Sequence, residues 1–132
     1  MGLNVVDASI SIALIDDADV LYEASAAVVA TDPAALILPA PAYAETMVRA
    51  HRDGTSTAVR DKLDGLGISI APLSEEMAEE AARLRARFPF LRLGDALVIA
   101  TARILDADEV LTGDRRWASV WDRVRVIAPD PG

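Results

Sequence analysis

Five short apolar runs, each closed by a Gly, Pro or acidic residue and separated by helical stretches, constrain this chain more than any other feature. Each run is rich in Val, Ile and Leu. Runs of this length and composition are typical of strands buried on both faces. Helical connections between them predict right-handed crossovers and a parallel sheet. We therefore expect an α/β fold of about five strands, at residues 3–6, 35–38, 68–71, 109–111 and 124–128.

The segments between the predicted strands carry helical patterns. The two long links, 8–31 and 40–66, are long enough for two helical segments each. Ser74 is a suitable N-cap for the next helix, which places acidic residues in its first turn and arginines near its end, as the helix dipole favours. The segment 95–105 is apolar almost all round and predicts a central buried helix.

Composition narrows the class of protein further. The 132 residues, 52% of them hydrophobic, suit a single domain over residues 1–132 with a real core. No apolar run reaches the roughly 18 residues of a membrane span, and the N-terminus lacks the basic start of a secretory signal. We expect a cytoplasmic protein with no membrane partner. Because there is no Cys and only one His, any metal would have to be bound by oxygen atoms.

The net charge of −8 argues against nucleic acid as a partner, because non-specific binding depends on positive charge. Any RNA binding would therefore have to come from local arginines. Arg115 and Arg116 are the best candidates because they adjoin Asp114, although a solvated surface role is the plainer alternative. Weaker candidates are Arg49, Arg52, Arg83, Arg87 and Arg92.

Acidic residues follow two of the predicted strands. Asp7 comes directly after the first strand and Asp114 shortly after the fourth. Ligands of parallel sheets bind beyond the carboxyl ends of the strands, where strand order reverses, so both carboxylates would face one crevice if these strands are neighbours. Glu45 and Asp95 are two further candidates. The plainer alternatives are an N-cap for Asp7 or Asp95 and an ion pair with Arg49 for Glu45.

Carboxylates gathered in one site need a counter-charge. Two carboxylates about 4 Å apart repel by roughly 4 kcal/mol at an effective dielectric near 20. Mg²⁺ or Mn²⁺ relieves this repulsion, and either ion can lower the pKa of a bound water and stabilise charge on a phosphodiester. Ser9 and Thr112 could bond a carboxylate or a metal-bound water. Their plainer roles are a helix N-cap and an ordinary strand threonine.

Four motifs occur in a characteristic order along the whole chain. They are VVDAS at 5–9, a looser PAYAE at 41–45, LGDALVIATA at 93–102 and VLTGDRRW at 110–117. Each motif alone is weak, but together they resemble the PIN-domain ribonucleases, and specifically the small VapC-like toxins of bacterial type II toxin–antitoxin pairs.

The resemblance implies a three-layer α/β/α PIN fold with the first and fourth strands adjacent. It implies Asp7, Glu45, Asp95 and Asp114 as the catalytic acids, with Asp7, Asp95 and Asp114 holding Mg²⁺ or Mn²⁺. Glu45 would bind the ion through water or orient the nucleophile. The implied activity is that of an endoribonuclease in which an activated water cleaves RNA. The implied partners are a second copy in a homodimer and a cognate antitoxin protein whose tail occupies the site.

Other classes of protein fit the sequence less well. A receiver domain needs an Asp after its middle strand and a Lys near the end of its last, whereas the only lysine here is Lys62. A haloacid-dehalogenase phosphatase has a second Asp where this chain has Ser9. A P-loop and a Gly-x-Ser-x-Gly elbow are both absent. Two alternatives stay open, a PIN nuclease that is not a toxin and a non-catalytic PIN-like module that binds RNA or protein.

Overall fold

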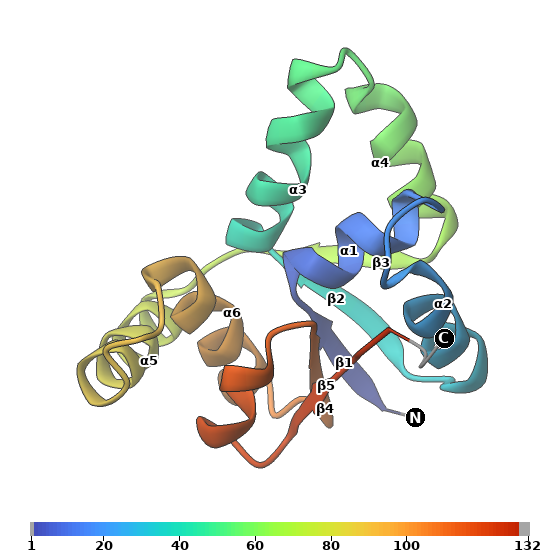
Figure 1. Cartoon of the computed structure of the whole chain (residues 1–132). Coiled ribbons are helices and arrows are strands. Elements are labelled where there is room, and N and C mark those ends of the chain that lie inside the picture. The colour runs from blue at the N-terminus through green and yellow to red at the C-terminus, as the bar shows by residue number, and fades with distance from the viewer. Residues whose placement is uncertain (1, 130–132) are drawn as a thin grey trace.

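The computed structural model describes residues 2–129, which form a five-stranded parallel sheet flanked by helices (Figure 1). The strand order is β3-β2-β1-β4-β5, and each neighbouring pair is parallel. The predicted α/β fold is therefore confirmed. The elements are β1 Leu3–Val6, α1 Ala8–Ile15, α2 Tyr22–Thr31, β2 Ala35–Pro39, α3 Ala40–Arg52, α4 Ser56–Gly65, β3 Ile68–Ala71, α5 Glu75–Arg87, α6 Leu93–Ile104, β4 Glu109–Thr112, the 3₁₀ helix η1 Arg115–Ser119 and β5 Val124–Val126.

The sheet forms the middle of three layers. α6 packs on β1, β2 and β4, and α5 lies on the outer side of α6. α1 and α2 cover the opposite side of the sheet, and α3 and α4 form a hairpin that rises beyond the carboxyl ends of the strands, at the top of Figure 1. This arrangement confirms the expected α/β/α layers and places the α3–α4 hairpin at the carboxyl ends of the strands.

Both long links contain two helices, as their length predicts. The first holds α1 and α2, and the second holds α3 and α4. Ser74 caps α5 as expected, because its Oγ accepts a hydrogen bond of 3.1 Å from the backbone N–H of Met77. None of the helices within residues 2–129 is long and apolar enough to cross a lipid bilayer.

Several element ends differ from the prediction by one or two residues. β2 and β4 each extend one residue further than expected, to Pro39 and Thr112. β5 ends at Val126 rather than at residue 128, because the backbone N–H of Ile127 already bonds the carbonyl of Thr112, the last residue of its only neighbour β4. α6 begins at Leu93, two residues before the predicted start.

α6 supplies the centre of the core, as its all-round apolar character predicts. Ile99 is 0% exposed and is flanked by the fully buried Ala96, Ala100 and Ala102. The small alanine side chains let the helix backbone approach the sheet closely, while Ile99 fills the remaining space. The same helix begins beside Asp95, so the packing of the core also fixes the position of this acid.

We expect Ile99→Ala to lower the free energy of unfolding by about 2–5 kcal/mol, because it removes a fully buried branched side chain and leaves a cavity. Ile104→Ala is the matched control on the same helix, since Ile104 is 37% exposed. Its cost should stay below about 1 kcal/mol. Urea denaturation followed by circular dichroism measures both values, and equal losses would contradict this account of the core.

Candidate active site

The pairing of β1 with β4 creates the site. Val6 lies beside Leu111 in the parallel register, and the backbone N–H of Asp7 continues the ladder with a 2.9 Å bond to the carbonyl of Leu111. The two strands therefore end at the same edge, with β2 and β5 on their outer sides. This edge is the point where strand order reverses, and Asp7 and Asp114 both lie there, as expected from the sequence.

A hydrogen-bond network orients the carboxylate of Asp7. Its Oδ2 accepts bonds from Ser9 Oγ at 2.8 Å and from Thr112 Oγ1 at 2.9 Å. Each hydroxyl is itself held by a backbone donor, the N–H of Gly113 at 3.0 Å for Ser9 and the N–H of Asp114 at 3.1 Å for Thr112. Both hydroxyl protons therefore point at Oδ2, and neither hydroxyl donates a hydrogen bond to Oδ1.

The plainer roles considered for Asp7, Ser9 and Thr112 do not account for the contacts that their side chains make. Asp7 occupies the N-cap position of α1, but its side chain makes no capping hydrogen bond there. Ser9 lies inside α1 rather than at its cap, and Thr112 bonds across strands to a carboxylate. Burial raises the pKa of Asp7, which is only 8% exposed, while the Ser9 and Thr112 bonds oppose that rise and repulsion from Asp95 adds to it.

Asp114 is the one candidate acid with a strong cationic partner. The guanidinium of Arg116 reaches it through both carboxylate oxygens, with Nε to Oδ1 at 3.1 Å and Nη2 to Oδ2 at 2.8 Å. The backbone N–H of Arg116 also donates to Oδ1 at 2.9 Å. These bonds, with the side-chain bond of Arg116 first, hold the pKa of Asp114 below its ordinary value.

Asp95 lies in the first turn of α6 and faces the same edge of the sheet. The helix N-cap is Arg92 rather than Asp95, so the predicted alternative of a capping aspartate is wrong. Burial is the main cause that raises the pKa of Asp95, and repulsion from Asp114 raises it further, whereas Arg92 opposes the rise. The Arg92 Nε lies 4.0 Å from Asp95 Oδ2, which is a loose ion pair between an exposed guanidinium and a largely buried carboxylate.

Glu45 projects from α3 toward the start of α6. Its Oε1 is 3.2 Å from the point where a Cβ on Gly94 would stand, so Gly94 leaves space for this carboxylate beside Asp95. Burial raises the pKa of Glu45 first, followed by repulsion from Asp7 and Asp95. The alternative ion pair with Arg49 is not formed, because Arg49 pairs with Asp53 at 3.7 Å.

The four acids thus influence one another, but their charges are unevenly compensated. Within residues 2–129, no three acidic or histidine side chains lie close enough together to hold one metal ion as they stand. Mutual repulsion and the Arg116 clamp on Asp114 both favour such a spread arrangement. The four side chains nevertheless fit a hard divalent cation, because all of them are carboxylates. Two hydroxyls also orient the Asp7 carboxylate through Oδ2, so its Oδ1 remains available as a ligand.

The structure also adds a residue that the sequence analysis missed. Phe90 lies in the loop before α6, and the guanidinium of Arg116 stands 5.7 Å from the centre of its ring. Phe90 belongs to none of the four sequence motifs, so only its place five residues before Asp95 could have drawn attention to it. The exposed side chain of Arg115 lies next to Arg116, while a separate cavity of about 300 Å³ between α1, α3 and α4 is lined by none of the four acids.

A parallel α/β sheet with acids at the reversal of strand order defines a class of protein, and comparison with known families identifies which one. The profile of the PIN domain matches residues 5–122. The chain therefore belongs to the PIN domain family. A search of curated proteins gave no match.

Solved structures with the same fold come from several bacteria. A toxin–antitoxin complex from Klebsiella pneumoniae is 22% identical with a TM-score of 0.79, over 93% of this chain and 96% of that one. VapC20 from Mycobacterium tuberculosis, described as a toxin that cleaves the Sarcin-Ricin loop, is 17% identical with a TM-score of 0.71, over 90% and 97%. VapBC2 from Rickettsia felis, bound to a DNA fragment from its promoter, is 13% identical with a TM-score of 0.74, over 96% and 99%. These likenesses show a common fold.

We expect Asp7→Asn to stabilise the metal-free protein by about 1 kcal/mol, a usual size for one favourable change. The amide oxygen can still accept both hydroxyl bonds, while the buried negative charge is removed. The pKa of Asp7 is raised above 3.8, so its contribution to stability is full below that pH and is lost as the pH rises through the folded-state value.

The advantage of Asp7→Asn should therefore be absent well below pH 3.8 and should grow as the pH rises toward neutrality. Urea denaturation in EDTA across this range measures the difference. Asp17→Asn, in an exposed turn, is a matched control that should show no such trend. An Asp7→Asn protein that is less stable than the parent at neutral pH would refute the proposed charge repulsion.

Proposed function

We propose that this protein is a metal-dependent endoribonuclease and the toxin of a toxin–antitoxin pair. The observation that carries the proposal is the undercompensated group Asp7, Glu45 and Asp95, next to Asp114, at the reversal of strand order in a PIN fold. Burial and mutual repulsion raise the pKa of the first three, as expected for a group of acids that has a cation as its missing partner.

The comparisons support the class of substrate and partner. Similar folds occur in toxin–antitoxin complexes, and VapC20 is described as cleaving the Sarcin-Ricin loop. We extend to this chain an RNA substrate, a cognate antitoxin protein that covers the acidic site, and a homodimeric assembly. We further propose that residues 1–132 form one PIN domain that acts in the cytoplasm.

Each residue of the site has a role in this proposal. Asp7, Asp95 and Asp114 would hold Mg²⁺ or Mn²⁺, and Glu45 would bind the ion through water or orient the attacking water. A bound ion of this kind lowers the pKa of water and stabilises the charge that develops on a phosphodiester. Ser9 and Thr112 keep the Asp7 carboxylate in one orientation and donate only to Oδ2, which leaves Oδ1 available for the ion.

The arginines beside Asp114 would contact the RNA backbone. A guanidinium binds a phosphate through two parallel hydrogen bonds, in the same way that Arg116 binds the Asp114 carboxylate here. Arg115 is exposed next to it. These two residues place positive charge at one side of the acids, which offsets the overall charge of −8 where the phosphates would lie.

Purified protein should cleave RNA in the presence of Mg²⁺ or Mn²⁺ and lose this activity in EDTA. We expect Asp7→Asn, Asp95→Asn and Asp114→Asn each to lower the cleavage rate by at least about 100-fold, because each removes charge from the cation site. Gel assays on total RNA and on a ribosomal RNA fragment measure the cleavage. Asp17→Asn is the control for a change of acidic residue away from the site.

Two outcomes would overturn the nuclease proposal. Cleavage that persists in EDTA, or that survives Asp7→Asn unchanged, would place the activity elsewhere. RNA binding without cleavage of any RNA tested, by a folded protein that binds Mn²⁺, would instead favour a non-catalytic binding module. Co-expression with the product of the adjacent reading frame tests the antitoxin, which should co-purify and suppress cleavage.

Replacing Arg115 and Arg116 together by Gln should weaken RNA binding and make it less sensitive to salt. Each lost phosphate contact lowers the slope of log affinity against log salt concentration by about 0.7 for a single strand. Fluorescence anisotropy in EDTA at several salt concentrations measures the slope. Arg60→Gln is the control, since Arg60 is an exposed arginine on α4 outside the candidate set. A wild-type slope in the double variant would exclude these phosphate contacts.

A further inference from the structure

The loop between α5 and α6, residues 88–92, is anchored by two hydrogen bonds and one buried side chain. Arg85 donates a 3.1 Å hydrogen bond from Nη1 to the carbonyl of Pro89, and the N–H of Leu91 bonds the carbonyl of Phe88 at 3.0 Å. The side chain of Leu91 is 1% exposed and anchors the loop in the core. The loop therefore has a defined conformation, and the side chain at its apex is held in place.

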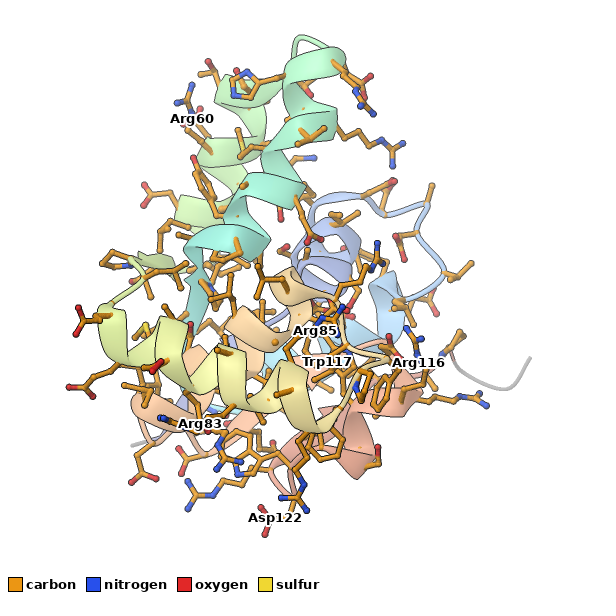
Figure 2. All side chains as sticks on the ribbon, turned by 90° about the vertical axis from the view of Figure 1, so that its left-hand side faces the viewer. Arg60, Arg83, Arg85, Arg116, Trp117 and Asp122 are labelled. Atoms are coloured by element: carbon orange, nitrogen blue, oxygen red, sulfur yellow. The ribbon has the colours of Figure 1, made fainter. Side chains whose placement is uncertain are left out.

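That apical side chain is Phe90, which is 40% exposed, whereas the next residue, Leu91, is buried. Its edge partner is Phe88, with the ring centres 6.2 Å apart and the planes at 73°. The guanidinium of Arg116 lies 5.7 Å from the ring centre. Arg85 and Arg116, both labelled in Figure 2, thus approach the same loop from α5 and from η1. The ring is exposed and oriented, although no partner within residues 2–129 covers it.

The position of this ring relative to the acids is set by Arg116. The same guanidinium that contacts Phe90 binds both oxygens of Asp114. On the other side, Arg92 follows Phe90 by two residues and lies 4.0 Å from Asp95. An aromatic face, two exposed guanidinium groups and two site acids therefore occupy one continuous stretch of surface.

We propose that Phe90 is a stacking platform for an unpaired RNA base next to the scissile phosphate. An exposed aromatic ring with flanking arginines is the combination that binds single-stranded nucleic acid, because the ring stacks on a base and the guanidinium groups contact the neighbouring phosphates. The substrate is then RNA that is single-stranded at the cut. This inference rests on the proposed ribonuclease function and assigns the nucleotide contact that this function lacks.

Stacking explains the arrangement better than a protein contact does. Protein interfaces also enrich aromatic residues and arginine, but their fully buried cores are apolar and depleted of charge. At Phe90, Arg116 contacts the ring, and Arg92 follows two residues later in the chain. The base of a nucleotide needs an accessible aromatic surface, and its phosphate needs a cation within a few ångströms of that surface. The 40% exposure of Phe90 provides the first, and Arg116, 5.7 Å from the ring centre, provides the second.

The test uses the full chain in EDTA, so that binding is measured without cleavage. The probe is a single-stranded oligoribonucleotide that carries one 2-aminopurine, whose fluorescence is quenched when the base stacks. We expect Phe90→Ala to weaken binding by about 10-fold, the usual effect of removing one stacking ring, and to abolish the quenching due to the protein. Phe90→Trp should restore both, whereas Phe90→Leu, which is apolar but cannot stack, should behave like Phe90→Ala.

Leu105→Ala is the matched control, because Leu105 is 36% exposed at the opposite end of α6. It should bind the probe like the parent protein. The same probe annealed into a duplex should show no loss of affinity in Phe90→Ala, since its bases are already stacked. Circular dichroism should show equal thermal stability for the Phe90 variants, as expected for a change at an exposed ring.

The outcomes separate this inference from the proposed function. If the parent protein cleaves RNA but Phe90→Ala or Phe90→Leu binds and quenches the probe like the parent, the stacking platform is refuted and the nuclease proposal stands. Phe90 would then be a contact for a protein partner. If the parent neither binds nor cleaves any RNA, the nuclease proposal itself fails, and the stacking platform fails with it.

Discussion

The parallel pairing of β1 with β4 is the interaction on which the rest of this molecule depends. It joins segments about a hundred residues apart in the chain, and the bond from Asp7 N–H to Leu111 carbonyl continues it to the edge of the sheet. The two side-chain bonds from Ser9 and Thr112 to Asp7 exist only because that register holds. A slip of one residue would turn Thr112 to the other face of the sheet and remove a donor from the carboxylate.

The same pairing concentrates negative charge where the fold gains nothing from it. Burial and repulsion raise the pKa of Asp7, Glu45 and Asp95. The ionised form of each therefore has a higher free energy in the folded state than in the unfolded chain. Of the four acids, only Asp114 has its ionised form stabilised, by Arg116. Unfavourable charge arrangements of this kind are typical of functional sites, where the surrounding core holds the charged side chains in place.

Much of this could be predicted from the sequence, for identifiable reasons. Short Val- and Ile-rich runs and their breakers indicated the strands, and acids after the first and fourth runs indicated the site, because the carboxyl ends of parallel strands meet at one edge. The exact ends of β5 and α6 could not be predicted, since β5 stops where its neighbour β4 stops. Nor could the partners of individual side chains, such as Arg49 with Asp53 rather than Glu45, because alternative helix neighbours differ by only a few tenths of a kcal/mol.

The candidate site has two halves that differ in how far their acids are paired with arginine. This difference bears on how a substrate would be oriented across the site. The half formed by Asp7, Glu45 and Asp95 has excess negative charge, so a cation bound by Asp7 and Asp95, with Asp114 as a ligand from the other half, would lower its energy. The half formed by Asp114, Arg116 and Phe90 has an arginine paired with its acid and presents a guanidinium and a partly exposed ring. A phosphate is repelled by the first half unless a cation intervenes, and is accepted by the second. Under the proposed ribonuclease function, an RNA strand would enter across Phe90 and Arg116 and present its scissile phosphate toward Asp7.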